Sequence, residues 1–234
     1  MKKFNGIKVK YYGHAAFRFI SPFGKVIFVD PWLNNPVSTT KDYDKADIIL
    51  LTHAHGDHIG DTIEIAKKTN AKVYSIHEIY VYLQSKGIKN SIGMNIGGHV
   101  KDGDIEIIQT EATHSSSIQE GDKIIPGGDP TGFVIKFENN FTVYHAGDTG
   151  VFSGMEIIGK LYKPDLALLP IGSHYTMGPL EASYACKLLK PKFVIPMHYG
   201  TFPILTGTPD EFKNQLDPSL NIEVIILKPG EEIE

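Results

Sequence analysis

The chain has 234 residues, of which 41% are hydrophobic, and it carries a formal net charge of −4 and one cysteine. This length and apolar content allow a substantial core and predict a single domain over residues 1–234. The acidic balance counts against a polyanion-binding surface, and therefore against nucleic acid as a partner.

The sequence also indicates where the protein resides. No stretch is apolar for long enough to cross a bilayer, and residues 1–12 lack the apolar segment of a secretory signal. The single cysteine, Cys186, cannot form an intrachain disulfide, which agrees with a reducing compartment. We therefore expect a cytoplasmic protein without a membrane partner, and the sequence leaves a homo-oligomer open.

The chain opens with a predicted antiparallel sheet. Turn-forming residues at 13–14 and 21–24 separate three apolar stretches. The third stretch ends at Asp30, which places a carboxylate where the chain leaves the sheet. The three expected strands cover residues 7–12, 15–20 and 25–29.

A buried strand over residues 47–51 follows, because residues 48–51 form a short continuous apolar stretch bounded by polar residues. Directly after it comes the stretch Thr52-His53-Ala54-His55-Gly56-Asp57-His58. Alternate side chains of an extended chain point the same way, so His53 and His55 can hold one ion from one side. Glycine is then expected to let the backbone turn and bring the following Asp-His pair towards a second ion.

The later elements alternate between helices and strands, with a β-rich middle. We expect helices over residues 61–69, 78–86, 155–161, 180–189 and 210–216. We expect strands over residues 72–76, 91–96, 104–112, 131–137, 141–145, 166–171, 193–197 and 222–227, with a turn at 101–103. The stretch 115–130 predicts a mobile rim or lid over the site, and a disordered surface insertion is the alternative.

Isolated metal-ligand residue types follow three of these strands, namely His114, Asp148 and His198. Taken singly, they can be read as a solvated loop histidine, a turn former and a packed side chain. Catalytic groups usually lie on loops at strand ends, so the joint placement of these three residues predicts one site. Asp30 is expected to orient a ligand histidine, with a strand-end cap as the alternative.

Three further histidines lie near these segments. His14 and His145 can each be either buried hydrogen-bonded residues or functional ones, and the sequence leaves both readings open. His174 follows an expected strand and can face a substrate.

The order of these motifs resembles that of the metallo-β-lactamase superfamily. The resemblance implies an α/β (α+β) fold, a four-layer αββα sandwich of two mixed β-sheets with helices outside. It further implies a ligand set in which His53, His55 and His114 hold one ion. Asp57, His58 and His198 would hold a second, and Asp148 would bridge the two.

A narrower resemblance rests on Tyr12-Gly13-His14-Ala15, residues 144–149, residues 170–172 and residues 176–179. These segments are similar to small metal-dependent hydrolases related to L-ascorbate-6-phosphate lactonase and to the phospholipase D that acts on N-acyl phosphatidylethanolamines. They suggest a cyclic ester or phosphoester of a small anionic metabolite.

Two divalent ions about 3.5–4 Å apart lower the pKa of a shared water and hold the resulting hydroxide as a nucleophile. The sequence therefore predicts a binuclear hydrolase that attacks a small anionic ester, lactone or phosphodiester through a metal-bridging hydroxide. Asp57, Asp148 and His174 are the expected catalytic residues, with Tyr175 as a further candidate acid. Zinc suits the ligands best, and manganese, iron and nickel are also compatible.

Two other functions stay open. One is a metal-dependent nuclease related to the tRNA-maturing enzymes, although the basic arm usual in that group is missing here. The other is a non-catalytic metal-binding protein that has kept the fold and the ligand residues.

Overall fold

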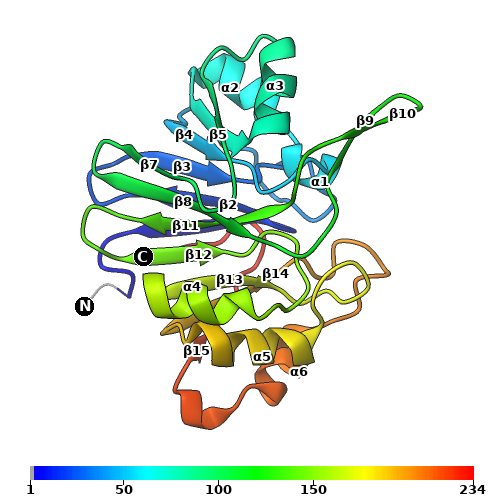
Figure 1. The fold of residues 1–234 in the computed structure, drawn as a ribbon. Helices are drawn as coiled ribbons and strands as arrows, with labels where there is room; N and C mark the ends of the chain where they lie inside the picture. Colours follow the sequence, from blue (N-terminus) through cyan, green and yellow to red (C-terminus); the bar gives the residue numbers. More distant parts are fainter. Residues whose placement is uncertain (1–2) are drawn as a thin grey trace.

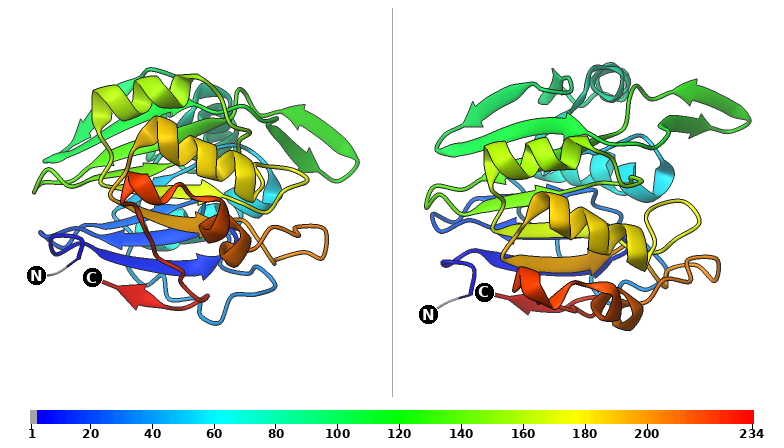
Figure 2. Two further views of the ribbon diagram at one scale, coloured as in Figure 1. Left: turned by 90° about the horizontal axis from the view of Figure 1, so that it is seen from below. Right: turned by 60° about the horizontal axis from the view of Figure 1, so that its bottom comes forward.

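The computed structural model describes residues 3–234, so residues 1 and 2, which the domain prediction included, lie outside the described part. Two seven-stranded sheets pack face to face, and helices cover the outer face of each (Figures 1 and 2). The expected four-layer αββα sandwich of two mixed sheets is confirmed.

The first sheet has the strand order β16-β1-β2-β3-β4-β5-β6. Strands from β16 to β3 pair antiparallel, and strands from β3 to β6 pair parallel. Their bounds are β1 Lys8–Gly13, β2 Ala16–Ile20, β3 Val26–Val29, β4 Ile48–Leu50, β5 Lys72–Ile76, β6 Ser91–Met94 and β16 Glu232–Ile233.

The second sheet repeats this plan in the order β15-β14-β13-β12-β11-β8-β7. Strands from β7 to β12 pair antiparallel, and strands from β12 to β15 pair parallel. Their bounds are β7 His99–Asp102, β8 Ile105–Glu111, β11 Thr131–Lys136, β12 Thr142–His145, β13 Leu166–Pro170, β14 Phe193–Met197 and β15 Glu223–Val224.

The helices divide between the two outer faces because each follows a strand of the sheet that it covers (Figure 1). The first sheet is covered by α2 Thr62–Thr69 and α3 His77–Ser85, and the short helix α1 Gly56–Ile59 precedes them. The second is covered by α4 Gly154–Tyr162, α5 Pro179–Leu189 and α6 Pro209–Gln215, followed by the 3₁₀ turn η1 Pro218–Leu220. None of the helices in residues 3–234 has the length and apolar character needed to cross a bilayer.

Both faces of the central strands are buried, which explains their continuous apolar sequences. Leu50 and Leu168 face the core between the two sheets. Their neighbours Ile49 and Leu169 face the helices outside, because successive side chains of a strand point to opposite faces.

The structure corrects several expected elements. Residues 99–102 form strand β7, which pairs with β8; the sequence predicted only a turn at 101–103, and the turn lies at residues 103 and 104. The stretch 115–130 contains an ordered hairpin of β9 Ser117–Glu120 and β10 Lys123–Pro126 (Figure 1). Strand β16 was missed because its partner β1 lies at the other end of the chain, and the strand expected over 222–227 is only two residues long.

Candidate metal centre

The predicted ligand residues follow four strands, β4, β8, β12 and β14, and converge at one edge of the sandwich. One nitrogen from each of His53, His55 and His114 lies within 4.8 Å of the others, and the distance from Nε2 of His53 to Nδ1 of His55 is 3.0 Å. We call these three residues the first cluster. They follow strands β4 and β8, which belong to different sheets.

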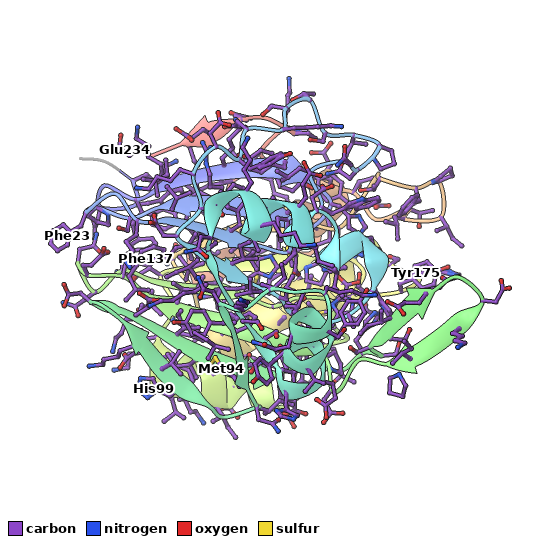
Figure 3. The ribbon with its side chains drawn as sticks, turned by 90° about the horizontal axis from the view of Figure 1, so that it is seen from above. Phe23, Met94, His99, Phe137, Tyr175 and Glu234 are labelled. Carbon is purple, nitrogen blue, oxygen red and sulfur yellow. The ribbon has the colours of Figure 1, made fainter. Side chains whose placement is uncertain are left out.

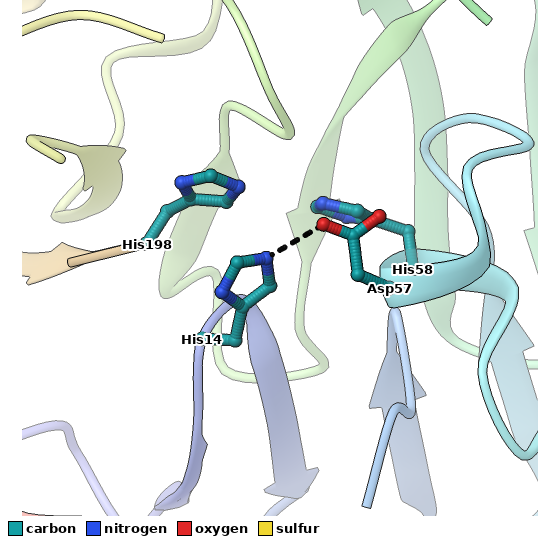
Figure 4. A group of neighbouring side chains, drawn as sticks. All are labelled: His14, Asp57, His58 and His198. Atoms are coloured by element: carbon teal, nitrogen blue, oxygen red, sulfur yellow. Dashed lines mark hydrogen bonds and ion pairs between the residues drawn. The ribbon is translucent and has the colours of Figure 1, made fainter. Parts of the chain in front are cut away.

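A second cluster contains Asp57, His58 and His198, together with His14, again with one ligand atom of each within 4.8 Å (Figure 4). Asp57 and His58 lie on α1, whereas His198 follows β14. The chain does turn after His55, but not through a backbone conformation that requires glycine at position 56, as the sequence had suggested. Gly56 begins α1 without a positive φ, and a Cβ there would meet nothing within 4 Å, so the short helix itself redirects the chain.

The Asp148 carboxylate lies between the two clusters. Its oxygens are 3.3 Å from Nε2 of His58, 2.9 Å from Nε2 of His198 and 3.7 Å from Nε2 of His114. Gly147 makes this placement possible, because its φ is +63° and a Cβ there would lie 2.6 Å from the carbonyl oxygen of Thr131. One carboxylate therefore reaches members of both clusters.

Several buried polar atoms at the centre of the described chain contact one another without forming a hydrogen bond. Within residues 3–234, no hydrogen bond reaches Nε2 of His58, Nε2 of His198 or Oδ1 of Asp148. A buried polar atom left without a partner costs about 1–3 kcal/mol. Divalent cations would satisfy these atoms, and the imidazole and carboxylate donors fit zinc and its first-row neighbours.

Asp30 and Thr52 fix which nitrogens face the centre. Nδ1 of His58 donates to Oδ2 of Asp30 at 2.8 Å, so that in the neutral imidazole Nε2 carries the lone pair that can bind a metal ion. The Thr52 hydroxyl donates to the same carboxylate at 2.6 Å and accepts from Nδ1 of His53 at 3.0 Å. Asp30 thus orients one histidine of each cluster. The sequence analysis missed Thr52, although its position between a buried strand and His53 was a usable signal.

Burial and charge set the protonation of these groups. Burial lowers the pKa of His53 well below its usual value, and it also lowers the pKa values of His55 and His114. The neutral imidazole that this favours is the form that binds metal. Burial lowers the pKa of His58, but the carboxylates of Asp148 and Asp30 raise it well above the usual value. Positive charge is therefore favoured beside these carboxylates.

A cavity of 380 Å³ opens over the centre. Its lining contains Ser115 and Tyr175 besides the candidate ligands, and it contains neither lysine nor arginine among the described residues. Figure 3 places Tyr175 at the hairpin end of the molecule, opposite Phe23. The lining residues are His55, Asp57, His114, Ser115, Asp148, Tyr175 and His198.

Two histidines that the sequence singled out lie outside this cavity. His174 is exposed, and its ring contacts Tyr175 with a centroid distance of 4.4 Å. His145 is buried with both nitrogens bonded, because Nδ1 accepts from the Gly147 amide and Nε2 donates to the Ala15 carbonyl. These bonds support a structural role for His145.

Comparison with known proteins identifies the family. The model of the beta-lactamase superfamily domain matches residues 23–199. A UPF0173 metal-dependent hydrolase from Caldivirga maquilingensis is 52% identical, covering 95% of this chain and 96% of the relative. Another from Koribacter versatilis is 49% identical, covering 97% of each chain.

Solved structures agree with this. A metallo hydrolase from the archaeon Ignicoccus hospitalis has a TM-score of 0.87 and 46% identity, with 97% of each chain covered. A metallo-beta-lactamase fold protein from Bacillus subtilis shares only the fold, with a TM-score of 0.72 and 18% identity over 97% of this chain and 98% of that one. The chain therefore belongs to the metallo-β-lactamase superfamily, as one of its metal-dependent hydrolases.

Proposed function

We propose that the protein is a binuclear hydrolase of small esters, lactones or phosphodiesters. His53, His55 and His114 hold one divalent ion, and Asp57, His58 and His198 hold the other. The observation that carries the proposal is the position of Asp148, whose carboxylate lies 2.9 Å from His198 in the second cluster and 3.7 Å from His114 in the first. A carboxylate so placed can bridge two ions.

When bound, a pair of divalent ions makes water a nucleophile at neutral pH and stabilises charge that develops on a substrate oxygen. The protein supplies the orientation. Asp30 and Thr52 keep the ligand nitrogens of His58 and His53 turned towards the centre. Both Tyr175 and His174 are exposed, but only Tyr175 lines the cavity, where it can donate a proton to the leaving group, so we favour it as the acid.

The cavity limits the substrate. Its 380 Å³ lies near the lower end of the range for small-molecule sites, which extends from about 300 to about 1,000 Å³. Because no lysine or arginine of residues 3–234 lines the cavity, the ions themselves are the positive charges that an anionic group of the substrate would meet there. A nuclease needs cationic side chains along a phosphate backbone, so this lining counts against the nuclease alternative. Zinc as the metal and a cytoplasmic location remain predictions from the sequence.

Substituting Asp148→Asn tests the proposal, with Asp44→Asn as a control because the Asp44 side chain is 93% exposed. We expect two ions per wild-type chain by elemental analysis and hydrolysis of members of a lactone and phosphodiester panel. The Asp148 variant should bind fewer ions and lose more than about 100-fold in turnover, beyond the usual effect of changing a residue that only supports a ligand. A fully metallated wild type with no activity on the panel would favour a non-catalytic metal-binding role.

A further inference from the structure

His14 is held in the second cluster by an unusual turn between β1 and β2. Its φ is 56°, in the left-handed region that residues other than glycine rarely adopt. Gly13 before it has a φ of +103°, and a Cβ there would lie 2.7 Å from Val37. The carbonyl oxygen of His14 accepts the amide of His198 at 2.7 Å. The turn therefore brings His14, at the end of a strand of the first sheet, into contact with His198, at the end of a strand of the second sheet.

Both ring nitrogens of His14 already have partners. Nε2 lies 3.0 Å from Oδ2 of Asp57, and Nδ1 lies 3.0 Å from Oγ1 of Thr201 (Figure 4 shows the first contact). One proton arrangement satisfies both, in which the Thr201 hydroxyl donates to Nδ1 and Nε2–H donates to Asp57. The Nε2 atoms of its neighbours His58 and His198 instead lie 3.3 and 2.9 Å from Asp148, the carboxylate between the two clusters.

Asp57 depends on this contact for its orientation. It lies on the four-residue helix α1, and its side chain is 30% exposed. In the described part of the chain, His14 is the one hydrogen-bond partner of its carboxylate. Trp32 and Phe202 pack against the imidazole with ring-centroid distances of 5.3 and 5.8 Å, so the fully buried His14 has little freedom to move.

We propose that His14 is a positioning residue that aims the Asp57 carboxylate at the second ion, and that the Thr201 hydroxyl fixes the tautomer it needs. In this arrangement His14 acts on the ion through Asp57, because its Nε2–H points at the Asp57 carboxylate and its Nδ1 accepts from Thr201. The affinity of the second ion then depends on His14, whereas that of the first ion does not. This inference rests on the proposed binuclear site, because it requires Asp57 to be a ligand.

The test measures the binding of Zn²⁺ and Co²⁺ by calorimetry and the Co²⁺ absorption spectrum. His14→Ala removes the hydrogen bond, whereas His14→Gln places an amide N–H near the position of Nε2. Thr201→Val removes the hydroxyl, and Thr201→Ser keeps it. His99→Ala is the control, since His99 is half exposed and pairs with Glu106 at 2.7 Å. The melting temperature of each metal-free variant shows whether it folds.

We expect His14→Ala to lower the affinity for the second ion by about 10- to 100-fold, as for other residues that orient a ligand. The affinity for the first ion should not change. His14→Gln and Thr201→Ser should recover most of this affinity, and Thr201→Val should lose part of it. Two ions bound with wild-type affinity by folded His14→Ala would overturn the inference. So would a His14→Gln variant as poor as His14→Ala with an altered Co²⁺ spectrum, since that result would make His14 a direct ligand.

Two other results would also overturn it. If His14→Ala binds both ions with equally reduced affinity and its metal-free form melts at a lower temperature than the wild type, His14 has only a structural role. In that case Thr201→Val, which leaves the imidazole in place, should weaken neither ion selectively. A wild type that binds one ion would overturn both this inference and the proposed binuclear function, whereas the outcomes above leave the latter intact.

Discussion

Oδ2 of Asp30 accepts a hydrogen bond from Nδ1 of His58 at 2.8 Å, and Asp30, which directly follows β3, has a left-handed φ of 46°. The same carboxylate accepts the Thr52 amide at 2.8 Å and the Thr52 hydroxyl at 2.6 Å. A single buried carboxylate therefore organises the loop that carries the first histidines. It has no direct contact with the cavity, because the lining does not include it.

Replacing Asp30 by Asn should weaken metal binding. In Asp30→Asn a single side-chain oxygen could still accept from His58 and from the Thr52 hydroxyl, which now share Oδ2. The NH₂ group would then face the Thr52 backbone N–H, which is also a donor. We expect about 10- to 100-fold weaker binding of both ions, because Asp30 supports one histidine of each cluster. Competition with a chelator of known affinity measures this, and Asp44→Asn is the control. Unchanged affinity in a folded variant would leave Asp30 as a strand-end cap.

Tyr175→Phe and His174→Ala separate the two candidate acids. A positioned general acid typically contributes about 10²- to 10⁴-fold, so Tyr175→Phe should lower kcat by at least about 100-fold with little change in KM. His174→Ala should leave kcat near the wild-type value, since the side chain is exposed outside the cavity. Steady-state kinetics on the best substrate of the panel decides this. The reverse result would restore His174 as the acid.

Asp102 links the two sheets and makes stability depend on pH. Burial raises its pKa, but hydrogen bonds from Lys72, Lys25 and Tyr74 lower it to about 2. Because the folded pKa lies below the ordinary 3.8, the stabilisation is complete above pH 3.8 and is lost as the pH falls towards about 2. We expect Asp102 to contribute about 1–2 kcal/mol to the free energy of unfolding at neutral pH. Solvent screening has lowered this figure, because the two lysine side chains are 38% and 50% exposed.

Denaturant unfolding of metal-free protein measures this contribution. Asp102→Asn should be less stable at neutral pH by that amount and should show a flatter decline in stability between pH 3.8 and about 2. The exposed Asp104→Asn is the matched control. Equal pH dependence in the variant and the wild type would assign the acid sensitivity to other carboxylates.

The β9–β10 hairpin should respond to binding at the centre. Its base is tied to the metal-binding loop, because the Ala54 amide donates to Oγ of Ser116 at 3.2 Å, and Ser115 lines the cavity. We therefore keep the prediction that it acts as a lid. Hydrogen exchange over residues 117–126 should slow when metal and a product analogue are added. Fast exchange that is identical in both states would leave the hairpin as a passive surface projection.

Local pattern was enough to predict much of this protein. Continuous apolar runs gave the central strands, because strands buried on both faces carry little else, and the spacing of the residues after Leu51 marked a metal-binding loop. Local pattern did not predict elements whose structure depends on a distant partner. Strand β16 is two residues long and exists because Val9 and Ile233 pair across the whole chain.

The same distinction holds at the candidate centre. The sequence by itself determined the residue types and their order along the chain, since ligand chemistry is a property of single side chains. Only the tertiary structure decided their roles. Whether an imidazole can bind an ion depends on the contacts of its two nitrogens. For His14 these contacts come from Asp57 and Thr201, 43 and 187 positions away, and for His145 one comes from the Ala15 carbonyl, 130 positions away.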